Sequence, residues 1–107
     1  MSITIEELRK MNPEKYQLID IRSESEIAHG AIPGATAIPA DEIEESNLTD
    51  RNKKLIICCS RGRNSIDLAE NLVEKGFDAE SLEGGYVAWL MDYMKRQEEA
   101  DFAKNVE

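Results

Sequence analysis

Short apolar runs recur along the chain, separated by polar segments. Two of them, residues 16–21 and 55–58, show no alternation of polar and apolar positions, which is typical of strands buried on both faces of a parallel sheet. Shorter runs at residues 36–38 and 79–82, together with an isolated Ile3, predict further short strands. The apolar pattern therefore predicts a sheet whose central strands are covered on both sides.

Helix signals occupy the segments between these runs. Thr4 and Glu7 form a capping-box signature, and Ser23 and Glu26 repeat it before a second short helix, which Gly30 is placed to close with a left-handed cap. Apolar residues at three- and four-residue spacing predict two longer helices, over residues 65–75 and from 86 to 93. The alternation of strands and helices predicts an α/β domain with a mainly parallel sheet and helices on both faces.

The 107 residues, 41% of them hydrophobic, are enough for one core, so we expect a single domain over residues 1–107. Its core is expected over residues 3–94. Residues 95–107 are polar enough to form either a surface helix or a frayed tail.

Charge and hydropathy limit the partners of this domain. With 22 acidic and 13 basic residues, the net charge of −9 repels nucleic acid and anionic lipid. No apolar run approaches the ~20 residues that span a bilayer, and the N-terminus lacks the basic and apolar regions of a signal peptide. We therefore expect no nucleic-acid or membrane partner, a cytoplasmic location, and thiols rather than disulfides.

The two cysteines stand side by side where a predicted strand ends and a helix begins. A helix that starts near Ser65 leaves its first N–H groups unpaired and carries partial positive charge at that end. Gly62 lets the loop curl so that its N–H groups point inward, and two arginines add positive charge. These features favour an anion and a thiolate, so Cys59 is the candidate nucleophile. The candidate substrate-binding residues are Ser60, Arg61, Gly62, Arg63, Asn64 and Ser65.

Other chemistry has weaker support in the sequence. Cys58 lies within the apolar run, so we expect it to pack in the core, with a resolving or redox role as the alternative. The single histidine, His29, follows a short helix and is expected to be a surface residue rather than a base. Two cysteines and one histidine cannot make a four-ligand zinc site, and the GxxxxGK phosphate loop is absent. We therefore expect no metal and no cofactor.

Three segments, in this order, resemble the single-domain rhodanese family of sulfurtransferases. They read LIDIRSESEIAHGAIPGATAIP, IICCSRGRNSIDLAENLVEKGF and LEGGYVAW, and the similarity extends from Ile3 to about Met91. The resemblance implies a rhodanese-like three-layer α/β domain with a five-stranded parallel sheet. It also implies that Asp20 and Arg22 form a structural pair that ties the second strand to its neighbours.

The resemblance further implies a thiosulfate sulfurtransferase type of activity. Cys59 would take a sulfane sulfur from thiosulfate or a related persulfide or polysulfide, hold it as a persulfide, and pass it to cyanide, a thiol or a protein sulfur acceptor. Two other functions stay open: a non-catalytic rhodanese-like module that binds a partner, and a thiol redox carrier that uses Cys58 and Cys59.

The chain departs from the family pattern in the loop. Asn64 stands where the family usually has arginine, and Arg61 and Arg63 lie nearby, so we expect the cation that meets the donor to come from a different position. The family's histidine after the helix-closing glycine is replaced by Ala31. Related phosphatases place an arginine six residues after the cysteine, where this chain has Ser65, so a phosphate monoester is not the expected substrate.

Overall fold

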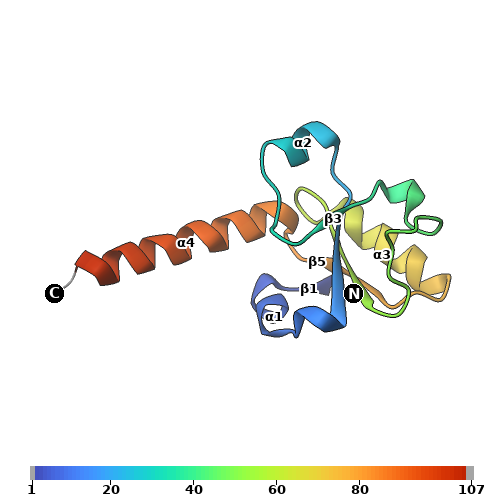
Figure 1. Cartoon of the computed structure of the whole chain (residues 1–107), viewed down its shortest axis with the longest axis horizontal. Helices are drawn as coiled ribbons and strands as arrows, with labels where there is room; N and C mark the ends of the chain where they lie inside the picture. Colours follow the sequence, from blue (N-terminus) through green and yellow to red (C-terminus); the bar gives the residue numbers. More distant parts are fainter. Residues whose placement is uncertain (1, 106–107) are drawn as a thin grey trace.

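The computed structural model describes residues 2–105, with side chains through residue 103. All strand pairs in its sheet are parallel, and the strand order is β1-β5-β4-β2-β3. The predicted strands are confirmed, with ends that shift by at most one residue (Figure 1). Their bounds are β1 Ser2–Ile3, β2 Tyr16–Asp20, β3 Thr36–Ala37, β4 Lys54–Cys58 and β5 Ala79–Leu82.

Helices connect the strands where the start signals predicted them. Both capping boxes form, Thr4 with Glu7 and Ser23 with Glu26. In each, the N-cap hydroxyl accepts from the backbone N–H of the glutamate, and the glutamate carboxylate accepts from the backbone N–H of the N-cap residue. The described residues contain four α-helices, α1 Ile5–Lys10, α2 Glu24–Ala28, α3 Asn64–Glu74 and α4 Gly85–Asn105, and two short 3-10 helices, η1 Pro13–Lys15 and η2 Ala40–Glu42.

The sheet separates two apolar layers, and β4 supplies side chains to both. Leu55 and Ile57 pack with Leu72 of α3, while Ile56 and Cys58 pack on the other face with α1 and the first turns of α4. These four β4 side chains are fully buried, and only Lys54 at the start of β4 is partly exposed. Burial of each large aliphatic side chain stabilises the fold by roughly 2 kcal/mol. Contact on both faces explains why this strand shows no polar alternation.

Helix α4 extends well beyond the rest of the fold (Figure 1). Its 21 residues rise over roughly 30 Å, and its second half projects away from the body, so the molecule measures 54 × 29 × 23 Å (Figure 1). Residues 95–105 are thus a helix rather than a frayed tail, while residues 106–107 lie outside the described part. Over residues 2–105, no helix has the length and apolar character needed to cross a membrane.

Candidate active site

The predicted site lies where β2, β4 and β5 end together. The register pairs Asp20 with Cys58 at the ends of β2 and β4, and the Ile21 N–H donates to the Cys58 carbonyl at 3.0 Å. From there the chain runs through residues 59–63 into α3. Because parallel strands bring their carboxyl ends to one edge of a sheet, the two chain segments that carry the candidate residues meet here.

Cys59 Sγ lies at the centre of the loop. The Gly62 N–H donates to this sulfur at 3.0 Å, and Ser65 Oγ lies 3.4 Å from it. Only 5% of the Cys59 surface is exposed. Gly62 has φ of 85°, and a Cβ at this residue would lie 2.8 Å from the Gly84 nitrogen. The tight curl that aims N–H groups at the sulfur therefore requires glycine.

Two opposing effects set the pKa of Cys59. Burial is the largest single influence and raises the pKa, because it removes water from the charged form. Hydrogen bonds from the Ser65 hydroxyl and from the N–H groups of Ser65, Gly62 and Asn64 lower it, and together they outweigh burial. The pKa of Cys59 therefore lies below that of an ordinary thiol, which increases the thiolate population at neutral pH.

Cys58 has the opposite surroundings. Its side chain is fully buried on the face that packs against α1 and α4, and its Sγ donates to the Cys59 carbonyl at 3.4 Å. Burial, together with the negative charge of Asp20, raises the pKa of Cys58 to about 12. This residue is thus a neutral thiol in the core, as its place in the apolar run predicted.

The first turn of α4 holds the backbone of the loop from below. The Tyr86 and Val87 N–H groups donate to the carbonyls of Cys59 and Ser60 at 2.8 and 3.0 Å. A Cβ on Gly85 would lie 2.3 Å from the Cys59 carbonyl oxygen, so only glycine permits this approach. The sequence predicts no site role for these residues, although consecutive glycines mark a turn and glycine permits close backbone approach.

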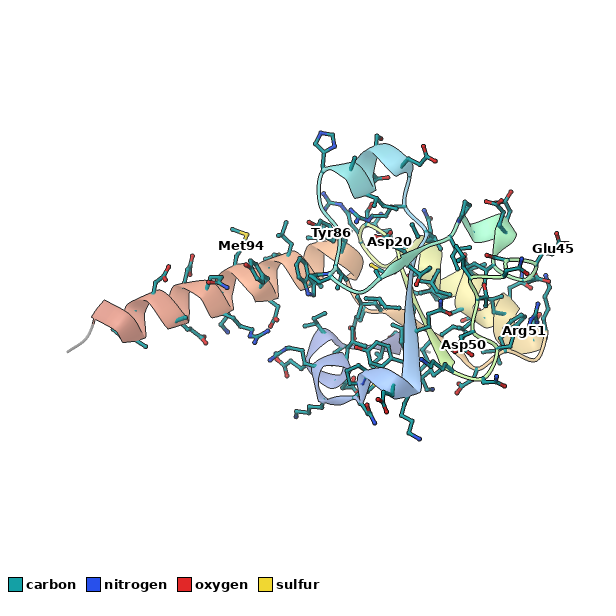
Figure 2. The ribbon with its side chains drawn as sticks, in the orientation of Figure 1. Asp20, Glu45, Asp50, Arg51, Tyr86 and Met94 are labelled. Carbon is teal, nitrogen blue, oxygen red and sulfur yellow. The ribbon has the colours of Figure 1, made fainter. Side chains whose placement is uncertain are left out.

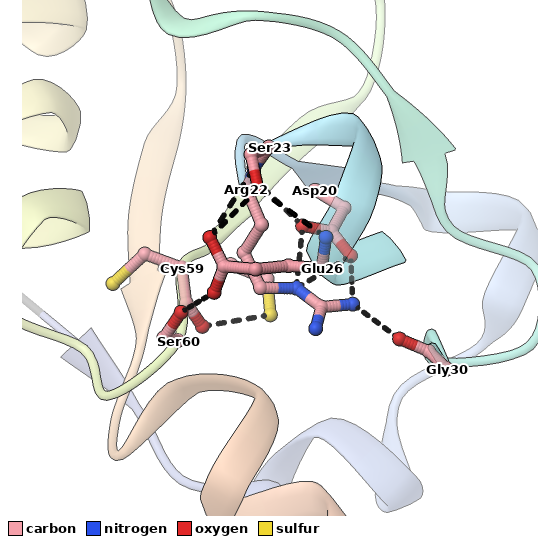
Figure 3. Close-up of polar contacts among 8 residues, drawn as sticks. Asp20, Arg22, Ser23, Glu26, Gly30, Cys59 and Ser60 are labelled. Carbon is pink, nitrogen blue, oxygen red and sulfur yellow. Dashed lines mark hydrogen bonds and ion pairs between the residues drawn. The ribbon is translucent and has the colours of Figure 1, made fainter. Parts of the chain in front are cut away.

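Helix α2 holds the loop from the other side. Ser60 Oγ donates to Glu26 Oε2 at 2.5 Å, while Glu26 Oε1 remains in the capping box with Ser23 (Figure 3). The hydrogen bond from Ser60, followed by those from Ser23, lowers the pKa of Glu26. The Ser60 hydroxyl, predicted to bind substrate, is therefore engaged with a carboxylate. Glu26 was missed as a site residue because its sequence signal is that of a helix cap.

Asp20 and Arg22 form a buried ion pair beside the loop. Arg22 Nη2 lies 2.8 Å from Asp20 Oδ2 and also donates to the Gly30 carbonyl at 2.7 Å (Figure 3). The guanidinium carbon lies 4.0 Å from the centre of the Tyr86 ring. The hydrogen bond with Asp20 raises the pKa of Arg22 further, so the side chain stays charged. This pair joins β2 to the segment after α2 and to α4.

Two features of the structure require glycine at position 30, the end of α2 and the neighbouring Tyr86. Gly30 directly follows the C-cap residue His29, its φ of 148° is positive, and its N–H donates to the Ile27 carbonyl at 3.1 Å. A Cβ on Gly30 would lie 2.6 Å from the Tyr86 hydroxyl oxygen. Gly30 thus ends α2 as predicted, with a φ larger than that of a left-handed helical cap, and the close approach of Tyr86 adds a second reason for glycine that the sequence does not show.

The remaining candidates surround an open pocket of about 290 Å³ above Cys59. Arg61, Arg63 and Asn64 have exposed side chains at its rim, and Asn64 also directs its N–H toward the sulfur. His29 is exposed, and its Nδ1–H donates to the Ser25 carbonyl at 2.7 Å instead of approaching Cys59. Within the described residues, no cluster of three or more His, Cys, Asp or Glu side chains could hold a metal ion.

Comparison with known proteins gives the family. The family model described as Rhodanese-like domain matches residues 4–92. The chain belongs to the rhodanese-like domain family. The predicted fold class is thereby confirmed, because solved structures of this family superpose on the domain. A Staphylococcus aureus rhodanese-like domain protein is 38% identical, with a TM-score of 0.70 over 82% of this chain and 89% of that one.

Relatives of this rhodanese-like domain carry sulfurtransferase names. YtwF of Bacillus subtilis (strain 168), provisionally named a sulfurtransferase, is 38% identical over 77 residues, 71% of this chain and 75% of that protein. Thiosulfate sulfurtransferase GlpE of Pseudoalteromonas translucida (strain TAC 125) is 32% identical over 93 residues, 85% of this chain and 89% of that protein. These relatives support a sulfurtransferase-type role for the rhodanese-like domain.

Proposed function

We propose that this rhodanese-like domain transfers sulfane sulfur through a persulfide on Cys59, with thiosulfate or a related persulfide or polysulfide as donor. The observation that carries the proposal is the pair of contacts to Cys59 Sγ, from the Gly62 N–H at 3.0 Å and from Ser65 at 3.4 Å. The same donors that stabilise a thiolate suit the negative outer sulfur of a persulfide. Because these donors lower the pKa of Cys59, the nucleophile forms without a histidine base.

The transfer has two displacement steps. In the first, the Cys59 thiolate attacks the outer sulfur of thiosulfate, a new S–S bond forms, and sulfite leaves with the electron pair of the broken S–S bond. In the second, the electron pair of cyanide or of an acceptor thiolate attacks the outer sulfur of the persulfide. Thiocyanate or a new persulfide is then released, and the Cys59 thiolate is restored.

Local charge at the pocket supports an anionic donor. Arg61 and Arg63 bring two cations to the rim of a pocket in a chain whose net charge is −9. A positive rim attracts a dianion and orients its sulfonate end away from the thiolate. A relative named thiosulfate sulfurtransferase supports the same donor. We also propose a cytoplasmic location, because free thiols are typical of reducing compartments.

Mass spectrometry of the intact protein tests this function directly. After incubation with thiosulfate or a polysulfide, the wild type is expected to gain the mass of one sulfur atom and to lose it on addition of cyanide. The variant Cys59→Ser should gain nothing, and the matched variant Cys58→Ser should load like the wild type. Loading of Cys59→Ser would refute the assignment, and failure of every donor on the wild type would favour the partner-binding module.

The intact mass after mild oxidation tests the redox alternative. A redox carrier would give a Cys58–Cys59 disulfide, lighter by two hydrogen atoms, after mild oxidation. Full burial of Cys58 and its raised pKa, about 12, argue against rapid formation of that disulfide.

A further inference from the structure

The second half of α4 has an unusual environment. Every side chain from Tyr93 to Ala103 is exposed, and the helix projects beyond the rest of the molecule (Figure 1). An isolated helix of fewer than ~12–15 residues is only marginally stable in water. This projecting segment therefore gains little from its own hydrogen bonds, and a contact along its length would stabilise it.

One face of this segment carries large apolar side chains. Met91, Met94 and Phe102 are 66%, 54% and 70% exposed. Their spacing of three and eight residues places them along one side of the helix, a surface we call the α4 stripe. Met94 points away from the helix with no other element beside it (Figure 2). Trp89, by contrast, lies on the opposite side and packs against the body.

Basic and acidic side chains are separated along the same segment. The basic residues Lys95 and Arg96 come first, and the acidic residues Glu98, Glu99 and Asp101 follow. Glu98 lies on the α4 stripe itself, between Met94 and Phe102. A carboxylate in the middle of an apolar contact requires a cationic partner.

We propose that the α4 stripe pairs with the α4 stripe of a second copy of this chain, antiparallel about a two-fold axis. An antiparallel register that places Met91 opposite Phe102 of the second copy also places Lys95 opposite its Glu98. The two-fold axis repeats both contacts, so four apolar side chains and two ion pairs meet at once. A parallel pair would place acid against acid and base against base, which disfavours it.

The mass of the purified full chain in solution tests this interface by light scattering. At ~100 µM, where a micromolar dissociation constant leaves mostly dimer, the wild type should have twice the 12.1-kDa mass of the chain. The variant Phe102→Glu should return it to the mass of a single chain. The matched variant Ala100→Glu places the same carboxylate on the opposite face of α4 and should remain a dimer.

A charge exchange tests the register. Lys95→Glu and Glu98→Lys should each weaken the dimer by about tenfold, and the double variant should restore it, because both ion pairs then form in reverse. A wild-type mass of one chain at every concentration would overturn the proposal in favour of a different occupant. Equal effects of Phe102→Glu and Ala100→Glu, or a double variant that stays monomeric, would overturn it as well. The mass in solution does not depend on sulfur loading, so the result is separate from that of the proposed function.

Discussion

Removal of the Ser65 hydroxyl tests how the loop activates Cys59. Ser65 is fully buried, and its Oγ lies 3.4 Å from Cys59 Sγ. Ser65→Ala removes the side-chain hydrogen bond that lowers the pKa of Cys59, while burial, which raises it, remains. The pKa of Cys59 therefore rises. A hydrogen bond to a charged group contributes about 1.5–3 kcal/mol, and the long contact to sulfur favours the lower end of that range. About 1.4 kcal/mol corresponds to a tenfold smaller thiolate population well below the pKa.

The rate of reaction changes less than the thiolate population. A more basic thiolate is a better nucleophile. With a Brønsted coefficient of about 0.4–0.5, a pKa higher by one unit makes the thiolate itself roughly threefold more reactive, which offsets part of the tenfold loss in its population. Ser65→Ala should therefore react about threefold more slowly than wild type at low pH and about threefold faster at high pH, where both are ionised. The two pH–rate curves should cross.

Alkylation by iodoacetamide, followed by mass spectrometry over a pH series, measures both limbs of the curve. A Cys58→Ala background leaves Cys59 as the only thiol. Ser60→Ala is the control, because the Ser60 hydroxyl donates to Glu26 and not to Cys59. Curves that coincide would show that Ser65 does not set the pKa of Cys59. A uniform loss of rate at all pH values would instead indicate a distorted loop and refute the electrostatic argument.

Three further changes probe the frame around the loop. Arg22→Ala leaves the Asp20 carboxylate buried without its partner and should lower the free energy of unfolding by about 3–5 kcal/mol in urea titrations; a loss below ~1 kcal/mol would contradict the ion-pair argument. Gly62→Ala places a Cβ 2.8 Å from the Gly84 nitrogen and should abolish persulfide loading, and full loading in the intact-mass assay would show that the curl is not required. Because folding raises the pKa of Cys58 from 9.0 to about 12, its contribution to stability is complete below pH 9 and falls by about 1.4 kcal/mol per unit as pH rises toward 12. The difference in unfolding free energy between wild type and Cys58→Ala should shrink over that range, and a constant difference would exclude this origin.

Local patterns accounted for most of the fold and for the centre of the site. The capping boxes involve residues three apart, and the apolar runs that became β2 and β4 are buried on both faces, so adjacent sequence carried their signals. The contacts to Cys59 come from Gly62 and Ser65, only three and six residues away. A strand that leads through a curled loop into a helix N-terminus is enough to predict an anion site there.

Contacts between distant segments were not accessible in the same way. The hydrogen bond between Glu26 and Ser60 spans 34 residues, and Tyr86 reaches the Cys59 carbonyl across a comparable separation. Gly30 illustrates the difference, because its sequence position indicates the end of a helix, whereas only the folded structure shows that Tyr86 leaves no room for a side chain there. Such contacts depend on how helices and strands from distant parts of the chain pack together, and no local sequence pattern predicts this packing.

The sequence by itself therefore determined the order of elements, the parallel sheet and the cysteine at the centre of the loop after β4, because each rests on hydrophobic burial or on hydrogen bonds within a few residues. Only the tertiary structure decided that α2 and α4 hold that loop in place, that hydrogen bonds outweigh burial in setting the pKa of Cys59, and that α4 continues beyond the body. These properties depend on which side chains and N–H groups the folded chain brings to each atom, and on how much water it leaves there.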